Sequence, residues 1–227
     1  MKGLNFDGIK NVLCLGAHSD DIEIGCGGTL RKLTQESPGL AVWWVVFTAD
    51  GKRRAEAKNS AQAFLRDAGK SQVIIKQFRN GYFPFEGAAI KDFFESLKSR
   101  VTPDLVFTHF RDDRHQDHRL VSDLTWNTFR NHLILEYEIP KFDGDFASPN
   151  FFVQINEQLA KEKVDNLCRC FTTQSDKHWF GRDVFLGLMR LRGMECCAEY
   201  AEAFYARKLT LNSAGDMVPG HARRTGQ

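Results

Sequence analysis

Two clusters of histidine and aspartate side chains are the residues of this sequence best suited to chemistry. Each cluster follows a short apolar run, and together they contain His18, Asp20, Asp21, His115, Asp117 and His118. Imidazole nitrogens and carboxylate oxygens are the usual ligands of catalytic zinc, which takes three protein ligands and leaves one position open for water. The clusters therefore predict a hydrolytic divalent-metal site.

The first cluster also contains one carboxylate more than such a site needs. Two histidines and one carboxylate complete a three-ligand set, and water that attacks a carbonyl carbon must lose a proton to a base. Asp20 and Asp21 are adjacent in the chain, so their side chains point in different directions and can divide these roles. His115 and His118 share a face if a helix has begun there, so one can bind metal while the other faces substrate.

The elements around these clusters alternate between apolar strands and amphipathic helices. The pattern predicts strands at 11–16, 41–48, 72–75 and 104–109. It predicts helices around 29–33 and at 54–68, 88–100, 116–130, 156–170 and 181–206. We expect Gly25–Gly28 to form a turn that allows close packing of strand and helix, and 137–153 to be irregular or edge-like.

This alternation predicts an α/β fold: a single Rossmann-like domain with a mostly parallel sheet flanked by helices. We expect the domain to span 1–211 and the polar segment 212–227 to be a mobile tail. Functional sites in such sheets lie at the carboxyl ends of the strands. Both clusters follow predicted strand ends, which supports the metal-site interpretation.

Composition excludes several other classes of protein. With 42% hydrophobic residues, 26% charged residues and a formal net charge of +2, the chain is typical of a soluble globular protein that binds no nucleic acid. No apolar run approaches the roughly 20 residues of a membrane-spanning helix, and no signal core is present, so we expect a cytoplasmic protein. The six cysteines are expected to be reduced thiols.

The two clusters resemble the motifs of the PIG-L/LmbE-like family of zinc-dependent sugar N-deacetylases. The matching residues are Ala17-His18-Ser19-Asp20-Asp21, with Gly25 and Gly28 downstream, and His115-Gln116-Asp117-His118-Arg119. The family usually has proline where this chain has Ser19, a difference that removes no ligand. The resemblance covers about 10–210 and is specific at the two motifs.

The resemblance implies a role for each residue of the clusters. His18, Asp21 and His118 would bind Zn²⁺, with another divalent ion such as Fe²⁺ as the alternative. Asp20 would be the general base, and His115 would polarise the developing oxyanion or protonate the departing amine. Asp117 would lie behind His115 and hold its ring. The substrate would be an N-acetylglucosamine-type sugar or sugar conjugate.

Further residues are candidates for substrate binding. Arg53 resembles the substrate-facing arginine of the family, although Arg54 is an equally near candidate and either can instead lie on a solvated surface. Lys141 could meet an acidic group of the substrate, but an ordinary exposed loop is the stronger interpretation. The remaining histidines, His109, His132, His178 and His221, are assigned to surface or structural positions. The late apolar helices offer an interface for a homo-oligomer.

Three other functions are weighed against the deacetylase. A dinucleotide-binding oxidoreductase shares the fold class but needs a glycine fingerprint that is missing after the first strand. A metal-binding module without activity would not need Asp20 and His115 beside the ligands. A zinc amidohydrolase that acts on a non-sugar amide would use the same residues, so only an assay separates it from the deacetylase.

Overall fold

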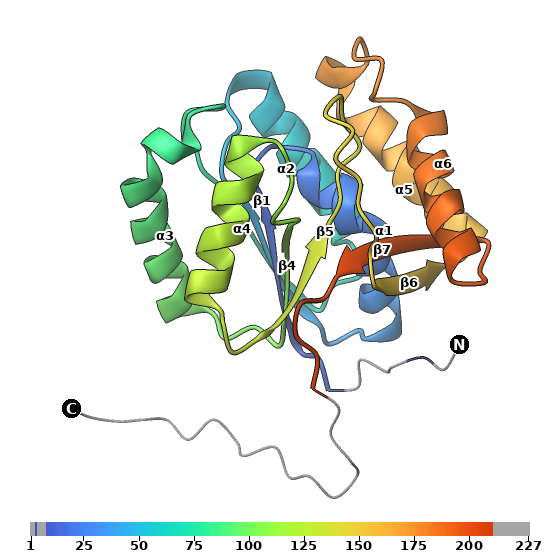
Figure 1. Ribbon diagram of the computed structural model, residues 1–227, viewed down its shortest axis with the longest axis horizontal. Coiled ribbons are helices and arrows are strands. Elements are labelled where there is room, and N and C mark those ends of the chain that lie inside the picture. Colours follow the sequence, from blue (N-terminus) through green and yellow to red (C-terminus); the bar gives the residue numbers. More distant parts are fainter. Residues whose placement is uncertain (1–2, 4–7, 211–227) are drawn as a thin grey trace, which may run out of the picture.

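The computed structural model describes residue 3 and residues 8–210, and every structural statement below refers to them. These residues form a single domain in which strands and helices alternate through the first two thirds of the chain (Figure 1). The strands are β1 (Asn11–Gly16), β2 (Ala41–Val46), β3 (Lys70–Ile75), β4 (Leu105–His109), β5 (Leu133–Tyr137), β6 (Phe151–Ile155) and β7 (Tyr200–Tyr205). The α-helices are α1 (Asp21–Glu36), α2 (Gly51–Phe64), α3 (Gly87–Arg100), α4 (Gln116–Thr128), α5 (Glu157–Cys170) and α6 (Arg182–Glu195). Two short 3-10 helices are η1 (Phe83–Phe85) and η2 (Thr172–Gln174).

The seven strands form one sheet in the order β3-β2-β1-β4-β5-β7-β6. The first five in this order pair in parallel, and β7 is antiparallel to both β5 and β6. This confirms the predicted fold class. Because β1 and β4 are parallel neighbours, their carboxyl ends lie side by side at one edge of the sheet.

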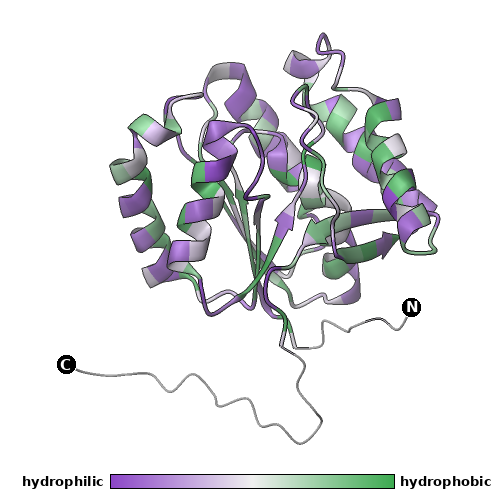
Figure 2. Cartoon of the chain, in the orientation of Figure 1, coloured by the Kyte–Doolittle hydropathy of each residue, from purple (hydrophilic) through white to green (hydrophobic). Residues whose placement is uncertain are grey.

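Helices cover both faces of the sheet, and alternate residues of each strand contact opposite helical layers. On β1, Val12 and Cys14 pack in the core beneath α1, α2, α5 and α6, whereas Leu13 and Leu15 pack with α3 and α4. In Figure 2 the central strands are mostly hydrophobic, and hydrophilic residues lie along the outer faces of the helices. Burial on both faces explains why the central strands read as continuous apolar runs.

The prediction of a turn at Gly25–Gly28 is wrong, because these residues lie inside α1. The glycines do allow close packing, as expected. A Cβ atom on Gly25 would lie 2.2 Å from the ring of Tyr137, and one on Gly27 would lie 2.5 Å from Phe64. Tertiary contacts thus overrule the low helix propensity of glycine at these positions.

The prediction of one helix over 181–206 is also wrong in its second half. Helix α6 ends at Glu195, the chain reverses through Cys197 with φ of 59°, and Tyr200–Tyr205 forms β7. The spacing of Tyr200, Ala203 and Phe204 fits a helical stripe, but β7 is buried along nearly its whole length between two strands. The segment 137–153, predicted to be irregular or edge-like, follows the prediction: 138–150 contains no helix or strand, and its last residues begin β6, which lies at an edge of the sheet.

The last strand supports the first helix through a buried ion pair. Glu202 on β7 accepts hydrogen bonds from the backbone N–H groups of Gly28 and Thr29 in α1, at 2.8 and 2.7 Å. Lys163 on α5 donates to Glu202 and to the carbonyl of Ile24, both at 2.6 Å. Each buried charge therefore has several partners, as burial of charged groups requires.

Within residue 3 and residues 8–210, no helix combines the length and apolar character needed to cross a membrane. The proposed tail, 212–227, falls outside the described residues.

Candidate metal centre

The two clusters meet at the carboxyl edge of the sheet because their strands are neighbours. His18 lies in the turn between β1 and α1, and Asp21 is the first residue of α1. His118 lies in the first turn of α4, which follows β4 after a short loop. In Figure 1 these helix starts lie at the same end of the molecule, above the carboxyl ends of β1 and β4.

Three of the predicted ligand atoms form a compact triangle. His18 Nδ1 lies 3.0 Å from His118 Nε2 and 3.3 Å from Asp21 Oδ2, and the last two atoms are 3.6 Å apart. Tetrahedral zinc with bonds of about 2.0–2.1 Å places its ligand atoms roughly 3.3 Å apart. The side chains are therefore spaced as a bound ion requires.

Hydrogen bonds on the far side of each ring direct lone pairs into this triangle. Nδ1 of His118 lies 2.9 Å from the Asp113 carboxylate, and Nε2 of His18 lies 3.3 Å from the Asp117 carboxylate. A carboxylate accepts hydrogen bonds, so these ring nitrogens carry the protons in the neutral imidazoles. The opposite nitrogens then present lone pairs to each other and to Asp21. Such a set of acceptors repels itself unless a cation lies among them, and this donor set fits a divalent metal.

The pKa values of His18, His118 and Asp21 also indicate that a positive charge is stabilised among these three side chains. Burial lowers the pKa of His18, but Asp21 and the hydrogen bond to Asp117 outweigh it and raise the pKa to about 10. Burial and the neighbouring His109 lower the pKa of His118 to about 3. Burial alone would raise the pKa of Asp21, yet His118, His109 and His18 together hold it well below its usual range. Without a metal, a second proton on His18 therefore supplies the positive charge beside the Asp21 carboxylate. A bound divalent ion would take the place of that charge once Nδ1 had lost its proton.

Asp20 lies next to the triangle with one oxygen unused. Its Oδ1 accepts a hydrogen bond from Arg53 at 3.0 Å, whereas its buried Oδ2 has no hydrogen-bond partner among the described residues. Burial raises the pKa of the Asp20 carboxyl despite the opposing effect of Arg53. A carboxylate with a raised pKa and an unpaired oxygen is suited to accept a proton.

His115 lies against the same cluster and is held by backbone groups. Its ring packs edge-on to His18 and stacks on His118, with centroids 4.7 and 4.6 Å apart. Its Nδ1 accepts a hydrogen bond from the backbone N–H of Asp117, which leaves Nε2 to carry the proton of the neutral ring. Burial, and then the charge of His18, lower its pKa. Near neutral pH the ring is therefore a neutral hydrogen-bond donor.

The prediction that the Asp117 carboxylate lies behind His115 and holds its ring is wrong. The carboxylate accepts hydrogen bonds from the backbone N–H groups of Gly81 and Phe83, at 2.7 and 3.1 Å, and lies beside His18 Nε2. The two N–H groups orient the carboxylate away from His115, whose ring is held by the Asp117 backbone instead. Asp117 therefore orients His18 and ties the η1 segment to the site.

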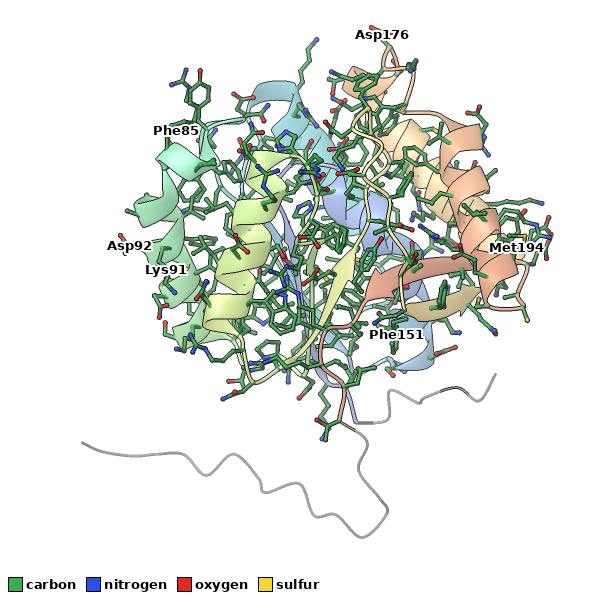
Figure 3. All side chains as sticks on the ribbon, in the orientation of Figure 1. Phe85, Lys91, Asp92, Phe151, Asp176 and Met194 are labelled. Carbon is green, nitrogen blue, oxygen red and sulfur yellow. The ribbon has the colours of Figure 1, made fainter. Side chains whose placement is uncertain are left out.

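The guanidinium groups of the two candidate substrate-binding arginines, Arg53 and Arg54, lie in different surroundings. Arg53 lines a hollow of about 450 Å³ together with His18, Asp50 and Arg79. Arg54 points away and donates to the carbonyl of Ile75. Phe85, the last residue of η1, is 84% exposed and lies at the surface of the molecule in Figure 3.

Lys141 is not free to meet a substrate. Its ammonium lies 3.0 Å from Asp113 and 2.5 Å from Asp145, and its side chain is only 10% exposed. The lysine thereby attaches the loop after β5 to the carboxylate that orients His118.

Two residues of the site, His109 and Asp113, were not predicted from the sequence. His109, assigned above to a surface or structural position, is fully buried, with Nε2 3.2 Å from Asp21 and its ring stacked on His118. It ends β4, so the strand-end rule applied to His18 could have found it. Asp113 has no such signal, because its contact with His118 depends on how the loop before α4 folds back.

The geometry offers more than one possible ligand set. His18, His115 and His118 converge, and so do Asp21, His109 and His118. Each set shares His118 with the triangle described above. A metal held here, beside a basic carboxylate and a neutral imidazole donor, is the arrangement that hydrolysis of an amide needs.

Comparison with known proteins gives a consistent assignment. The family model described as PIG-L, GlcNAc-PI de-N-acetylase, matches residues 13–129, a span that includes both clusters. The uncharacterized deacetylase YaiS of Escherichia coli (strain K12) is 32% identical over 168 residues, which cover 68% of this chain and 87% of that protein.

Solved structures share the fold at lower identity. The N,N'-diacetylchitobiose deacetylase of Pyrococcus horikoshii matches with a TM-score of 0.68 and 23% identity, covering 88% of this chain and 84% of that chain. GalB of Pseudomonas putida KT2440, a 4-carboxy-2-hydroxymuconate hydratase, matches with a TM-score of 0.70 and 17% identity, covering 91% of this chain and 100% of that chain. These structures show that the fold supports more than one reaction, so the function must be argued from the site.

Proposed function

The chain belongs to the PIG-L family of GlcNAc-PI de-N-acetylases, and on this basis we propose that it removes the acetyl group from an N-acetylglucosamine-type sugar or sugar conjugate. The family hydrolyses amide bonds. The observation that carries the proposal is the convergence of the ligand atoms of His18, Asp21 and His118 near Asp20, whose Oδ2 has no hydrogen-bond partner in the part of the chain that the structure describes.

We propose His18, Asp21 and His118 as the ligands of a zinc ion, with Fe²⁺ as the alternative metal. When bound, the ion supplies Lewis acidity that polarises the amide carbonyl and lowers the pKa of water. Asp113 and Asp117 hold the rings of the two histidine ligands in the tautomers that binding requires.

Asp20 is proposed as the general base. As water adds to the amide carbon, one of its protons passes to Oδ2 of Asp20. Asp20 then returns this proton to the departing nitrogen as the C–N bond breaks, which releases acetic acid, ionised to acetate in solution, and a free amine. His115 is proposed to donate a hydrogen bond from Nε2 to the carbonyl oxygen as negative charge develops there. Its lowered pKa favours this donor role over proton transfer to the departing amine.

The sequence predicts that Arg53 binds substrate, but its hydrogen bonds to Ser19 and Asp20 favour a role at the base instead. The cytoplasmic location expected from the sequence stays a prediction. Formation of a homo-oligomer through the late helices likewise stays a prediction. The hollow beside His18, lined by Arg53, Asp50 and Arg79, is the proposed position of the sugar. Its charged and polar lining suits hydroxyl groups better than an apolar amide.

A panel of N-acetylated compounds tests the proposal. The protein would be loaded separately with Zn²⁺ and Fe²⁺, its metal content measured, and acetate release followed from N-acetylglucosamine, N,N'-diacetylchitobiose and N-acetylated amino acids. We expect release from at least one sugar, and we expect Asp20→Asn to lose nearly all turnover, leaving only a small residual rate, while it retains metal. A control is Asp112→Asn, at an exposed residue near the site.

Other outcomes would replace the proposal. Release from the amino acids alone would indicate a non-sugar amidohydrolase. Metal binding without turnover of any amide would indicate a metal-binding module.

A further inference from the structure

Arg53 bridges two consecutive side chains of the first cluster. Its Nε donates a hydrogen bond to Ser19 Oγ at 2.9 Å, and its terminal Nη2 donates to Asp20 Oδ1 at 3.0 Å. Ser19 and Asp20 are buried, with 1% and 3% of their surfaces exposed. The contact is therefore shielded from solvent on the side that faces the metal centre.

The planar geometry of the guanidinium makes the two bonds interdependent. Its N–H groups form a rigid fork, so an acceptor at Nε fixes the plane in which the terminal nitrogens lie. With Ser19 at Nε, one terminal nitrogen is directed at Oδ1 of Asp20. If the hydroxyl is removed, one anchor is lost and the arginine can rotate into the adjoining hollow.

The bridge also separates the roles of the two Asp20 oxygens. Oδ1 is occupied by Arg53, and Oδ2 is buried without a partner among the residues described. A partial rotation of the carboxylate that turned its second oxygen away from the reacting water would lengthen or break the bond between Oδ1 and Arg53. The bridge thus keeps one oxygen directed at the reacting water.

We infer that Ser19 is a positioning residue: its hydroxyl holds Arg53 against Asp20, and Arg53 acts on the base rather than as an anchor for the sugar. This inference rests on the proposed function, in which Asp20 accepts the proton. It assigns a purpose to the residue at which this chain differs from the resembled motif. It also predicts that Arg53 contributes to the rate of the reaction and little to substrate affinity.

Steady-state kinetics of Ser19→Ala, Ser19→Thr, Arg53→Gln and Arg54→Gln separate these roles. We expect Ser19→Ala to lower kcat about tenfold, the loss of one hydrogen bond to a charged group, with KM changed less than twofold. Ser19→Thr keeps the hydroxyl and should restore most of the rate. Arg54→Gln is the matched control, because this arginine lies in the same helical turn but bonds to Ile75.

A double-mutant comparison tests whether the effect passes through Asp20. In an Asp20→Asn background, Ser19→Ala should cause no further loss of kcat, since the base is already absent. Independent losses in that background would overturn the inference. So would a rise in KM with kcat unchanged, because that result means direct substrate binding.

A measurement without substrate separates failure of the inference from failure of the proposed function. The Nε–H signal of Arg53, assigned by NMR through its loss in Arg53→Lys, should exchange slowly with water in the wild type. It should exchange rapidly in Ser19→Ala and remain slow in Arg54→Gln. Absence of turnover on every amide would contradict the proposed function alone, whereas equal exchange in Ser19→Ala and wild type would contradict the inference.

Discussion

Asp113 and His118 form a buried carboxylate–imidazole pair, with Oδ2 2.9 Å from Nδ1. The other oxygen of Asp113 accepts a hydrogen bond from the backbone N–H of His115 at 2.8 Å. One side chain therefore sets the tautomer of a proposed ligand and the position of a proposed oxyanion donor. Both functions require its negative charge, which the neighbouring His118 and Lys141 stabilise by lowering its pKa against the effect of burial.

We expect Asp113→Asn to weaken zinc binding about 10–100-fold, the usual effect of replacing a carboxylate that orients a histidine ligand. The amide has a single acceptor oxygen and an NH2 group that donates, so it cannot accept at both positions that Asp113 uses, and it carries no charge. Competition with a chromophoric chelator would measure the affinity. Asp112→Asn, one residue away and exposed, should bind zinc as the wild type does, and equal affinities of all three proteins would contradict the prediction.

Removal of the metal should lower the thermal stability of the protein. The lone pairs of His18, Asp21 and His118 converge within 3.6 Å, and a ligand that binds only the folded state stabilises it by mass action. Treatment with a chelator should lower the Tm by several degrees, and added zinc should restore it. His118→Gln should show no zinc-dependent shift; a shift of the wild-type size in this variant would exclude His118 as a ligand.

Glu23 should make the protein less stable as the pH rises. Burial raises the pKa of this carboxyl well above its usual range, with Ser60 acting in the opposite direction. Between the usual and the raised pKa the folded state keeps a proton that the unfolded state has lost, so the free energy of unfolding falls by up to about 1.4 kcal/mol per pH unit. Glu23→Gln keeps the shape without the charge and should flatten this slope between pH 5 and 8.

Urea unfolding at several pH values would measure this effect at equal metal content. The variant should be more stable than the wild type at pH 8. Glu199→Gln, at an exposed position, should leave the slope unchanged. A slope as steep in Glu23→Gln as in the wild type would show that another group titrates.

Two glycines in helices should respond in opposite ways to an added methyl group. A Cβ on Gly25 would lie 2.2 Å from the ring of Tyr137, whose hydroxyl is fixed by a 2.6 Å bond to the carbonyl of Leu15. We expect Gly25→Ala to destabilise the protein by about 1–3 kcal/mol or more. Gly187 in α6 meets nothing within 4 Å, so Gly187→Ala should stabilise by about 0.5–1 kcal/mol. Denaturation midpoints would decide, and a neutral Gly25→Ala would mean that Tyr137 can move.

The parts of the fold that the sequence predicts are those governed by local pattern. The buried run in β2 and the stripe on α3 are visible in the residues themselves, and the strand-end rule places His18 near His118. The pairing of β7 with β5 is not visible, because Tyr200–Tyr205 has helical spacing and is a strand only through its neighbours.

The site also combines features that the local sequence predicts with features that depend on tertiary contacts. Residue types identify the proposed ligands, but the partner of each carboxylate depends on loop geometry. Asp117 bonds to Gly81 and Phe83, residues brought to it by the chain after β3. The choice between Arg53 and Arg54 is likewise decided by the direction of α2, which turns one arginine to Asp20 and the other to Ile75.

The two hydrogen bonds from the N–H groups of Gly28 and Thr29 to Glu202 can form only late in the synthesis of the chain. The ribosome releases α1 early, whereas Glu202 emerges 174 residues after Gly28. Until then the glycine-rich middle of α1 lacks the carboxylate that receives its N–H groups, and Lys163 lacks its counter-ion. The nascent chain therefore carries the proposed ligands His18 and Asp21 long before the helix that follows them gains its contacts with β7.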